Sequence, residues 1–123
     1  MTIEIEVLHA NDTLDEIEAL ADVLVDCVRS GASLGFMLPY GLDEARLFWH
    51  TVAEAVRGGS TILLVAKLEG EIVGTVQLGL AARANQLHRA DVMKLLVHRK
   101  ARGKGISRLL MEALEQEAIK RGR

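Results

Sequence analysis

A basic, glycine-containing turn is the part of this sequence best suited to chemistry. It covers residues 102–107, reads Arg-Gly-Lys-Gly-Ile-Ser, and follows the apolar run 92–97. Two glycines permit a sharp bend and a ligand close to the backbone. A helix that begins here would offer unpaired N–H groups and a dipole that favour an anion. No acidic residue separates the basic side chains of this segment, which are Arg99, Lys100, Arg102, Lys104 and Arg108. We therefore expect a phosphate-bearing ligand at this turn.

Two widespread phosphate-binding motifs do not fit the turn. A Walker A loop needs Gly, four residues and then Gly-Lys-Ser/Thr, which this chain does not contain. The dinucleotide fingerprint needs a third glycine where Arg108 stands. The pattern that does fit is Arg-x-x-Gly-x-small, read as Arg102, Gly105 and Ser107. It resembles the acyl-CoA signature of the GNAT family of N-acetyltransferases, with serine at a position that is usually Gly or Ala.

Hydrophobic periodicity predicts the elements that position the turn. Alternating residues predict a strand over 2–8. Thr13 and Glu16 have the spacing of a capping box, which predicts a helix that begins at Thr13 and ends near Gly31. The other expected elements are a helix over about 43–57, a hairpin of strands 60–68 and 71–80 that turns at Glu69-Gly70, a strand over 91–97 and a helix over 105–121. The order is β-α-α-β-β-β-α, which is an α/β fold.

Composition limits the class of protein. The length of 123 residues suits one domain, and a hydrophobic content of 50% suffices for a core. A net charge of −2 with 3% aromatic residues gives no support for binding nucleic acid or an anionic membrane. No apolar run approaches the roughly 18 residues of a membrane span, so a cytoplasmic protein is expected. The one cysteine, Cys27, excludes an intrachain disulfide, and the scattered histidines lack the spacing of a metal site.

The resemblance to GNAT N-acetyltransferases extends over essentially the whole chain. Segments 31–36 and 87–92 are similar to the corresponding parts of tabtoxin-resistance acetyltransferases. The resemblance implies a mixed, mostly antiparallel sheet flanked by helices, with residues 1–123 as the N-terminal two-thirds of a single domain that lacks its C-terminal strand-helix-strands. It also implies transfer of an acetyl group from acetyl-CoA, by direct attack in a ternary complex, to a primary amine of a small molecule such as a toxin or an antibiotic.

The same resemblance suggests roles for individual residues. The backbone of strand 95–97 would hold the pantetheine arm by β-augmentation, and one of its N–H groups would polarise the thioester. Asp91 would be the base that removes the amine proton. Ser33 and Phe36 would line the acceptor pocket. The residues expected to bind acetyl-CoA are Leu95, Leu96, Val97, Arg102, Gly103, Lys104, Gly105, Ile106, Ser107 and Arg108.

Several of these residues have a purely structural alternative. Asp91 could be a surface carboxylate paired with Arg89 or Lys94, in which case His88 is the alternative base. Phe36 could be a core residue and the serine at position 33 a turn residue. The buried-type setting of the cysteine fits a reduced core thiol better than a nucleophile.

The order of elements also bears on association. The chain ends at Arg123, directly after its last expected helix. A strand followed by a packed helix normally continues into a neighbouring parallel strand. An open edge on strand 91–97 predicts association, as a homo-oligomer or through completion by a C-terminal fragment. A non-catalytic CoA-binding or assembly module is therefore the alternative to an active acetyltransferase.

Overall fold

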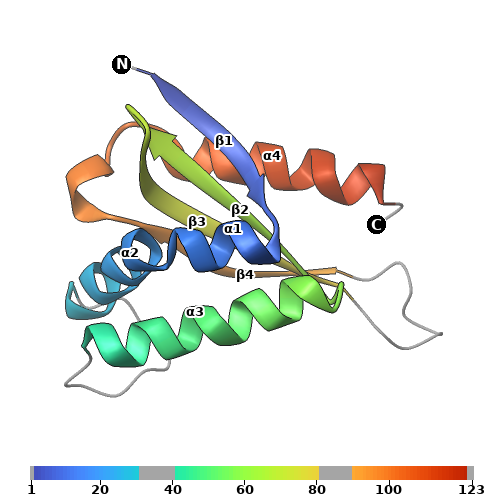
Figure 1. Ribbon diagram of the computed structural model, residues 1–123. Coiled ribbons are helices and arrows are strands. Elements are labelled where there is room, and N and C mark those ends of the chain that lie inside the picture. Colours follow the sequence, from blue (N-terminus) through green and yellow to red (C-terminus); the bar gives the residue numbers. More distant parts are fainter. Residues whose placement is uncertain (1, 31–40, 81–89, 122–123) are drawn as a thin grey trace.

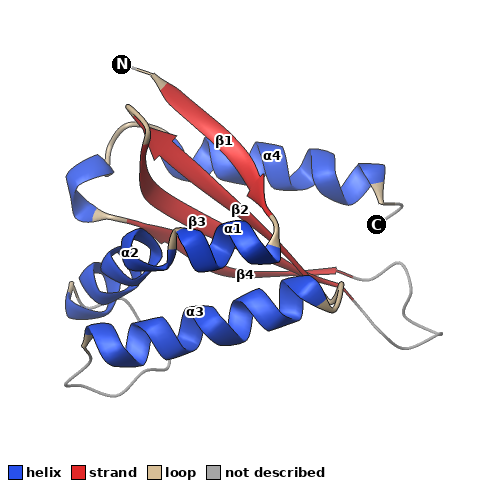
Figure 2. Ribbon diagram, in the orientation of Figure 1, coloured by secondary structure: helices blue, strands red, loops and turns tan. Residues whose placement is uncertain are grey.

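A four-stranded antiparallel sheet lies at the centre of the fold. The computed structural model describes residues 2–30, 41–80 and 90–121, and side chains are described outside residues 90–94. In these ranges the strand order is β1-β2-β3-β4, and each pair is antiparallel (Figure 1). The strands are β1 (Ile3–Leu8), β2 (Thr61–Leu68), β3 (Glu71–Leu80) and β4 (Ala90–Val97). The expected fold class, an α/β fold with a mostly antiparallel sheet flanked by helices, is confirmed (Figure 2).

The predicted hairpin between β2 and β3 is present, and its turn has the backbone that the sequence requires. Glu69 and Gly70 both have positive φ, at 52° and 82°. Two such residues make the tight turn whose twist matches that of antiparallel strands. Leu68 therefore pairs with Glu71 directly across the turn. The pair of strands supplies the apolar centre of the sheet, since residues 61–66 and 72–78 are buried.

In the described part of the connection from β1 to β2, residues 9–30 and 41–60, three helices are found rather than the two expected. They are α1 (Ala10–Asp15), α2 (Ile17–Arg29) and α3 (Leu42–Arg57). The predicted capping box at Thr13 and Glu16 is wrong, because the helix begins at Ala10. The backbone N–H of His9 donates to the Oδ2 of Asp12 at 3.2 Å, and the buried hydroxyl of Thr13 donates to the carbonyl of His9 at 2.9 Å. Thr13 thus lies inside the first helix, and Glu16 lies at the break between α1 and α2.

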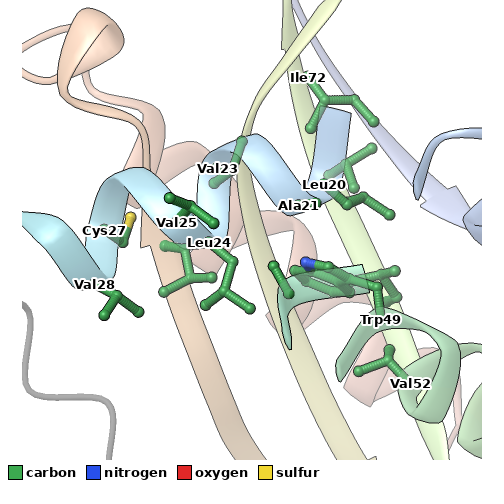
Figure 3. Packing of buried hydrophobic residues seen from close by; sticks show 14 of the residues in the cluster. Leu20, Ala21, Val23, Leu24, Val25, Cys27, Val28, Trp49, Val52 and Ile72 are labelled. Atoms are coloured by element: carbon green, nitrogen blue, oxygen red, sulfur yellow. The ribbon is translucent and has the colours of Figure 1, made fainter. Parts of the chain in front are cut away.

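Helices cover both faces of the sheet. On one face, α2 and α3 pack against the sheet through a cluster that includes Leu20, Leu24, Trp49 and Ile72 (Figure 3). On the other face, α4 (Ile106–Lys120) packs through Ile106, Leu110 and Leu114 against β2 and β3. Figure 1 shows α4 on the opposite side of the sheet from α1, α2 and α3. The sheet is therefore the middle layer of three.

Close packing fixes the start of α4 against β3. A Cβ atom placed on Gly74 of β3 would lie 3.1 Å from the Cγ2 of Ile106 and 3.2 Å from both the Cδ1 of Leu110 and the carbonyl oxygen of Leu96. Only glycine leaves room for the helix at this distance from the strand. The N-terminus of α4 is consequently held against the sheet and close to β4.

Strand β4 lies at one edge of the described sheet. It pairs with β3, and no second partner strand is found within residues 2–30, 41–80 and 90–121. The edge matches the open edge expected for strand 91–97, while association through it remains a prediction. Of the helices that the structure describes, none has the length and apolar character needed to span a membrane.

Candidate functional site

The predicted sequence of strand, basic turn and helix is present. Strand β4 ends at Val97, and a 3-10 helix, η2 (Arg99–Ala101), connects it to the turn. Gly103 and Gly105 have φ of 82° and 76°, in the left-handed region where glycine is favoured. Gly105 is the N-cap of α4. Both glycines are therefore required by the backbone of the turn.

The start of α4 faces a hollow on the surface of the protein. The hollow has a volume of about 420 Å³. Eight residues line it, and they are Val97, Ala101, Arg102, Gly103, Gly105, Ile106, Ser107 and Arg108. Seven of these are among the residues expected to bind acetyl-CoA, so the structure brings most of that set together around one space. Lys104 lies exposed in the same turn.

Backbone N–H groups at the start of α4 are suited to an anion. The amide of Leu109 makes the bond to the carbonyl of Gly105 at 3.1 Å. The amides of residues 106–108 precede it and have no partner within the helix. The side chain of Ile106 is 1% exposed and belongs to the core, so this residue can offer a ligand only its backbone. The hollow therefore lies at the positive end of the α4 dipole and beside N–H donors that have no partner within the helix.

The five basic side chains of the segment do not all face this hollow. Arg99 pairs with the carboxylate of Asp26 at 2.8 Å, and Lys100 pairs with Glu71. The hydrogen bond from Lys100 lowers the pKa of Glu71. Sequence reasoning missed both carboxylates, because they lie 73 and 29 residues away along the chain.

Three of the five cations remain near the helix start. Arg102 and Arg108 line the hollow, and Lys104 is exposed in the turn beside it. The ion pair of Arg108 with Glu112 is long, at 3.9 Å, and both side chains are largely exposed. A surface pair of this kind holds its partners only weakly. The positive charge available to a ligand therefore comes from the turn and the first turn of α4.

The carbonyl group of Val97 points away from the neighbouring strand. The amide of His98 donates to the carbonyl of Val73 on β3 at 2.8 Å, and backbone groups alternate in direction along an antiparallel strand. In agreement, the carbonyl of Val97 accepts from the Nε of Arg102 at 3.1 Å and from the thiol of Cys27 at 3.5 Å. Burial raises the pKa of this thiol, which fits a core thiol. The same alternation directs the N–H of Val97 away from β3.

Residues 95 and 96 are placed differently from Val97. Leu96 is buried, and its backbone alternates toward Thr75 of β3. Leu95 is 40% exposed. The register shifts so that Gln77 faces Met93 while Thr75 faces Leu96, which leaves one extra residue in β4. A bulge of this kind bends the strand and changes the direction of its backbone groups, and bulges are frequent beside active sites.

The expected acceptor residues and the side chain of the expected base lie outside the described part of the structure. Asp91 lies near the start of β4, opposite Gly79, and its side chain is outside the description. At roughly 3.3 Å per residue, about 10–13 Å of strand separate it from the bulge. Ser33, Phe36 and His88 fall outside the described residues. Among the residues that are described, no group of three or more His, Cys, Asp or Glu could hold a metal ion.

Comparison with known proteins gives the family. The sequence model described as "Acetyltransferase (GNAT) family" matches residues 27–123. An uncharacterized N-acetyltransferase in the hisH-hisA intergenic region of Azospirillum brasilense is 33% identical over 111 residues, which are 87% of this chain. The chain spans 64% of the length of that relative. The protein belongs to the GNAT acetyltransferase family.

Solved structures agree on the fold. PaiA N-acetyltransferase from Thermoplasma acidophilum, solved in complex with coenzyme A, superposes with a TM-score of 0.76 at 18% identity, over 99% of this chain and 75% of that chain. An aminoglycoside acetyltransferase from an uncultured soil metagenomic sample, in complex with sisomicin, gives a TM-score of 0.70 at 21% identity, over 98% of this chain and 72% of that one. At these identities the likeness concerns the fold.

Proposed function

We propose that this protein is an acetyl-CoA-dependent N-acetyltransferase that acts on a primary amine of a small molecule. The observation that carries the proposal is the hollow at the start of α4, which is lined by Arg102, Ser107 and Arg108. The first N–H groups of this helix have no partner within the helix. Such a site suits the diphosphate of coenzyme A. Family membership and a structural neighbour solved with coenzyme A support this donor.

The chemistry proposed is direct attack of the amine on the thioester. The amine nitrogen forms a bond to the acetyl carbon, the C–S bond breaks, and the departing coenzyme A thiolate takes up the second proton, which the nitrogen releases. A lysine-like amine has a pKa of about 10.4 and must lose a proton before it attacks. Asp91 is the proposed base, acting through a water because of its short side chain. The N–H of Val97, on the side of β4 that faces away from β3, is the proposed donor to the thioester oxygen.

The acceptor is proposed at the level of its chemical class. Resemblance to tabtoxin-resistance acetyltransferases favours an amine-bearing toxin or antibiotic. A structural neighbour solved with the aminoglycoside sisomicin has the same fold and takes an amine-rich small molecule. Ser33 and Phe36 are the proposed acceptor contacts.

An acetyl-transfer assay tests the proposal. Purified protein is incubated with acetyl-CoA and a panel of small primary amines, and released coenzyme A is measured together with the mass of the acceptor. Transfer above the background of protein-free reactions is expected for at least one amine. Calorimetry with coenzyme A is run in parallel. Tight binding with no transfer to any amine would favour the non-catalytic CoA-binding module, and no binding would overturn the proposal.

A further inference from the structure

A buried carboxylate lies next to the proposed donor site and takes no part in the proposed chemistry. Asp26 is in the last turns of α2, and its side chain is 5% exposed. Its Oδ2 accepts from the backbone N–H of Arg99 at 2.9 Å, and its Oδ1 accepts from the Nε of Arg99 at 2.8 Å. Burying a carboxylate is costly unless it is paired and hydrogen-bonded. Both oxygens of Asp26 are thus committed to one residue.

That residue begins the segment that joins β4 to the phosphate-binding turn. Arg99 is the first residue of η2, and an N–H at the start of a helical turn has no helical partner. Asp26 supplies the partner from a different part of the chain. His98, the residue before Arg99, caps the same turn, because its Nδ1 accepts from the backbone N–H of Lys100 at 3.2 Å. The position of η2 therefore depends on α2.

Cys27, the residue after Asp26, contacts the chain on the N-terminal side of η2. The thiol of Cys27 donates to the carbonyl of Val97, and the Nε of Arg102 donates to the same oxygen. Asp26 thus contacts Arg99, the first residue of η2, and Cys27 contacts Val97, which precedes η2. Arg102, which follows η2, folds back to the same carbonyl of Val97. A shift of η2 would move Arg102 and the start of α4 together.

We propose that Asp26 is a positioning residue for the diphosphate of the donor, an assignment that rests on the proposed function. Asp26 is not in the set of residues that line the hollow. It acts through the N–H of Arg99, and so fixes where Arg102 and the free N–H groups of α4 meet the ligand. The guanidinium of Arg99 is 74% exposed, and its ion pair with Asp26 is secondary to the backbone bond.

The experiment compares the affinity for coenzyme A in the unaltered chain and in three variants, by calorimetry. Asp26→Ala is expected to raise the Kd about tenfold, because displaced ligand-binding groups lose their alignment. Arg99→Ala keeps the backbone bond and is expected to stay within about threefold. Glu18→Ala is the matched control, since this 66% exposed carboxylate of the same helix pairs with Arg46 of α3 at 2.8 Å. Its Kd is expected to match that of the unaltered chain.

A second ligand separates positioning from a general loss of structure. Acetylpantetheine lacks the diphosphate, and its affinity, measured from shifts of amide resonances, is expected to be the same in Asp26→Ala and the unaltered chain. An equal weakening for both ligands would make the role merely structural and would overturn the assignment. If Asp26→Ala does not fold, Asp26→Ser decides, because its side chain is one atom shorter and loses the acceptor for the N–H of Arg99; a rise of about threefold is expected in the Kd for coenzyme A alone. Unchanged affinity for coenzyme A in that variant would overturn the assignment.

The two proposals fail in different ways. If the unaltered chain binds no coenzyme A, the proposed function is overturned, and the assignment of Asp26 with it. If the unaltered chain binds coenzyme A and Asp26→Ala binds it equally well, the assignment of Asp26 alone is overturned.

Discussion

The side chain of Arg102 folds back onto the strand that precedes it, with its Nε 3.1 Å from the carbonyl oxygen of Val97. The two residues lie at opposite ends of η2, so this bond closes the segment into a loop. The same carbonyl accepts from Cys27 of α2, which ties the loop to the helical layer. Arg102 also lines the hollow at the start of α4. The side chain of Arg102 therefore connects β4, which is proposed to bind the thioester, to the hollow that is proposed to bind the diphosphate.

Gly105→Glu is expected to abolish binding of coenzyme A. The substitution places a side chain and a negative charge where an anion is proposed to sit, at the N-cap of α4. Gly105 has a φ of 76°, and this backbone conformation is strained for any residue with a Cβ. Gly59→Glu is the matched control, because Gly59 has a φ of 82°, open space around it and a position remote from the hollow. Calorimetry should detect binding in the control alone, and unchanged affinity in Gly105→Glu would remove the turn from the site.

Arg108→Ala is expected to weaken binding of coenzyme A more than Lys100→Ala does. Each substitution removes one positive charge from the same segment. Arg108 lines the hollow, whereas Lys100 is paired with Glu71. Loss of a charged contact to phosphate should raise the Kd roughly tenfold, which corresponds to about 1.4 kcal/mol. Lys100→Ala should stay within about twofold. Equal effects in a titration at fixed salt would mean that net charge, rather than position, governs binding.

Local signals in the sequence predicted the elements that build the site. The glycines at 103 and 105, the apolar strand before them and the amphipathic helix after them act over a few residues, so their consequence can be predicted without tertiary contacts. The hairpin at Glu69-Gly70 was predictable for the same reason. The start of the first helix was not, because His9 and Thr13 are alternative N-cap positions, and the carboxylate of Asp12 caps back to His9.

The partners of the basic residues could not be predicted from the sequence. Asp26 and Arg99 are 73 residues apart, and only the packing of α2 beside β4 brings them together. No local spacing signals such a pair. The bulge in β4 could not be predicted either. Lys94 and Leu95 fit a regular strand pattern, and the extra residue depends on the register with β3.

Cys27 should make the stability of the fold depend on pH in the alkaline range. Burial raises the pKa of the Cys27 thiol above that of the unfolded chain, because a buried thiolate is unfavourable. The stabilising contribution is therefore fully present below the unfolded pKa of about 8.5 and is lost as the pH rises through the folded pKa. The Cys27→Ser variant keeps a hydrogen-bond donor for Val97 but does not titrate in this range.

Urea unfolding at pH 8 and pH 10 measures this effect. The free energy of unfolding should fall more for the unaltered chain than for Cys27→Ser over this interval. A difference between the two proteins that stays constant with pH would show that the thiol does not titrate differently in the folded state.

Asp91→Asn is expected to lower turnover while leaving the affinity for coenzyme A unchanged. Asp91 lies in β4 near the end remote from Val97, opposite Gly79, and so away from the hollow that is proposed to bind the diphosphate. Removal of a general base usually lowers kcat by roughly 10²–10⁴. Asp43→Asn is the control, since that carboxylate is 95% exposed and lies in α3. Turnover and calorimetry are measured on the same preparations. A loss of turnover below about threefold at neutral pH would assign Asp91 to a surface ion pair, because base removal from a catalytic site costs far more than this.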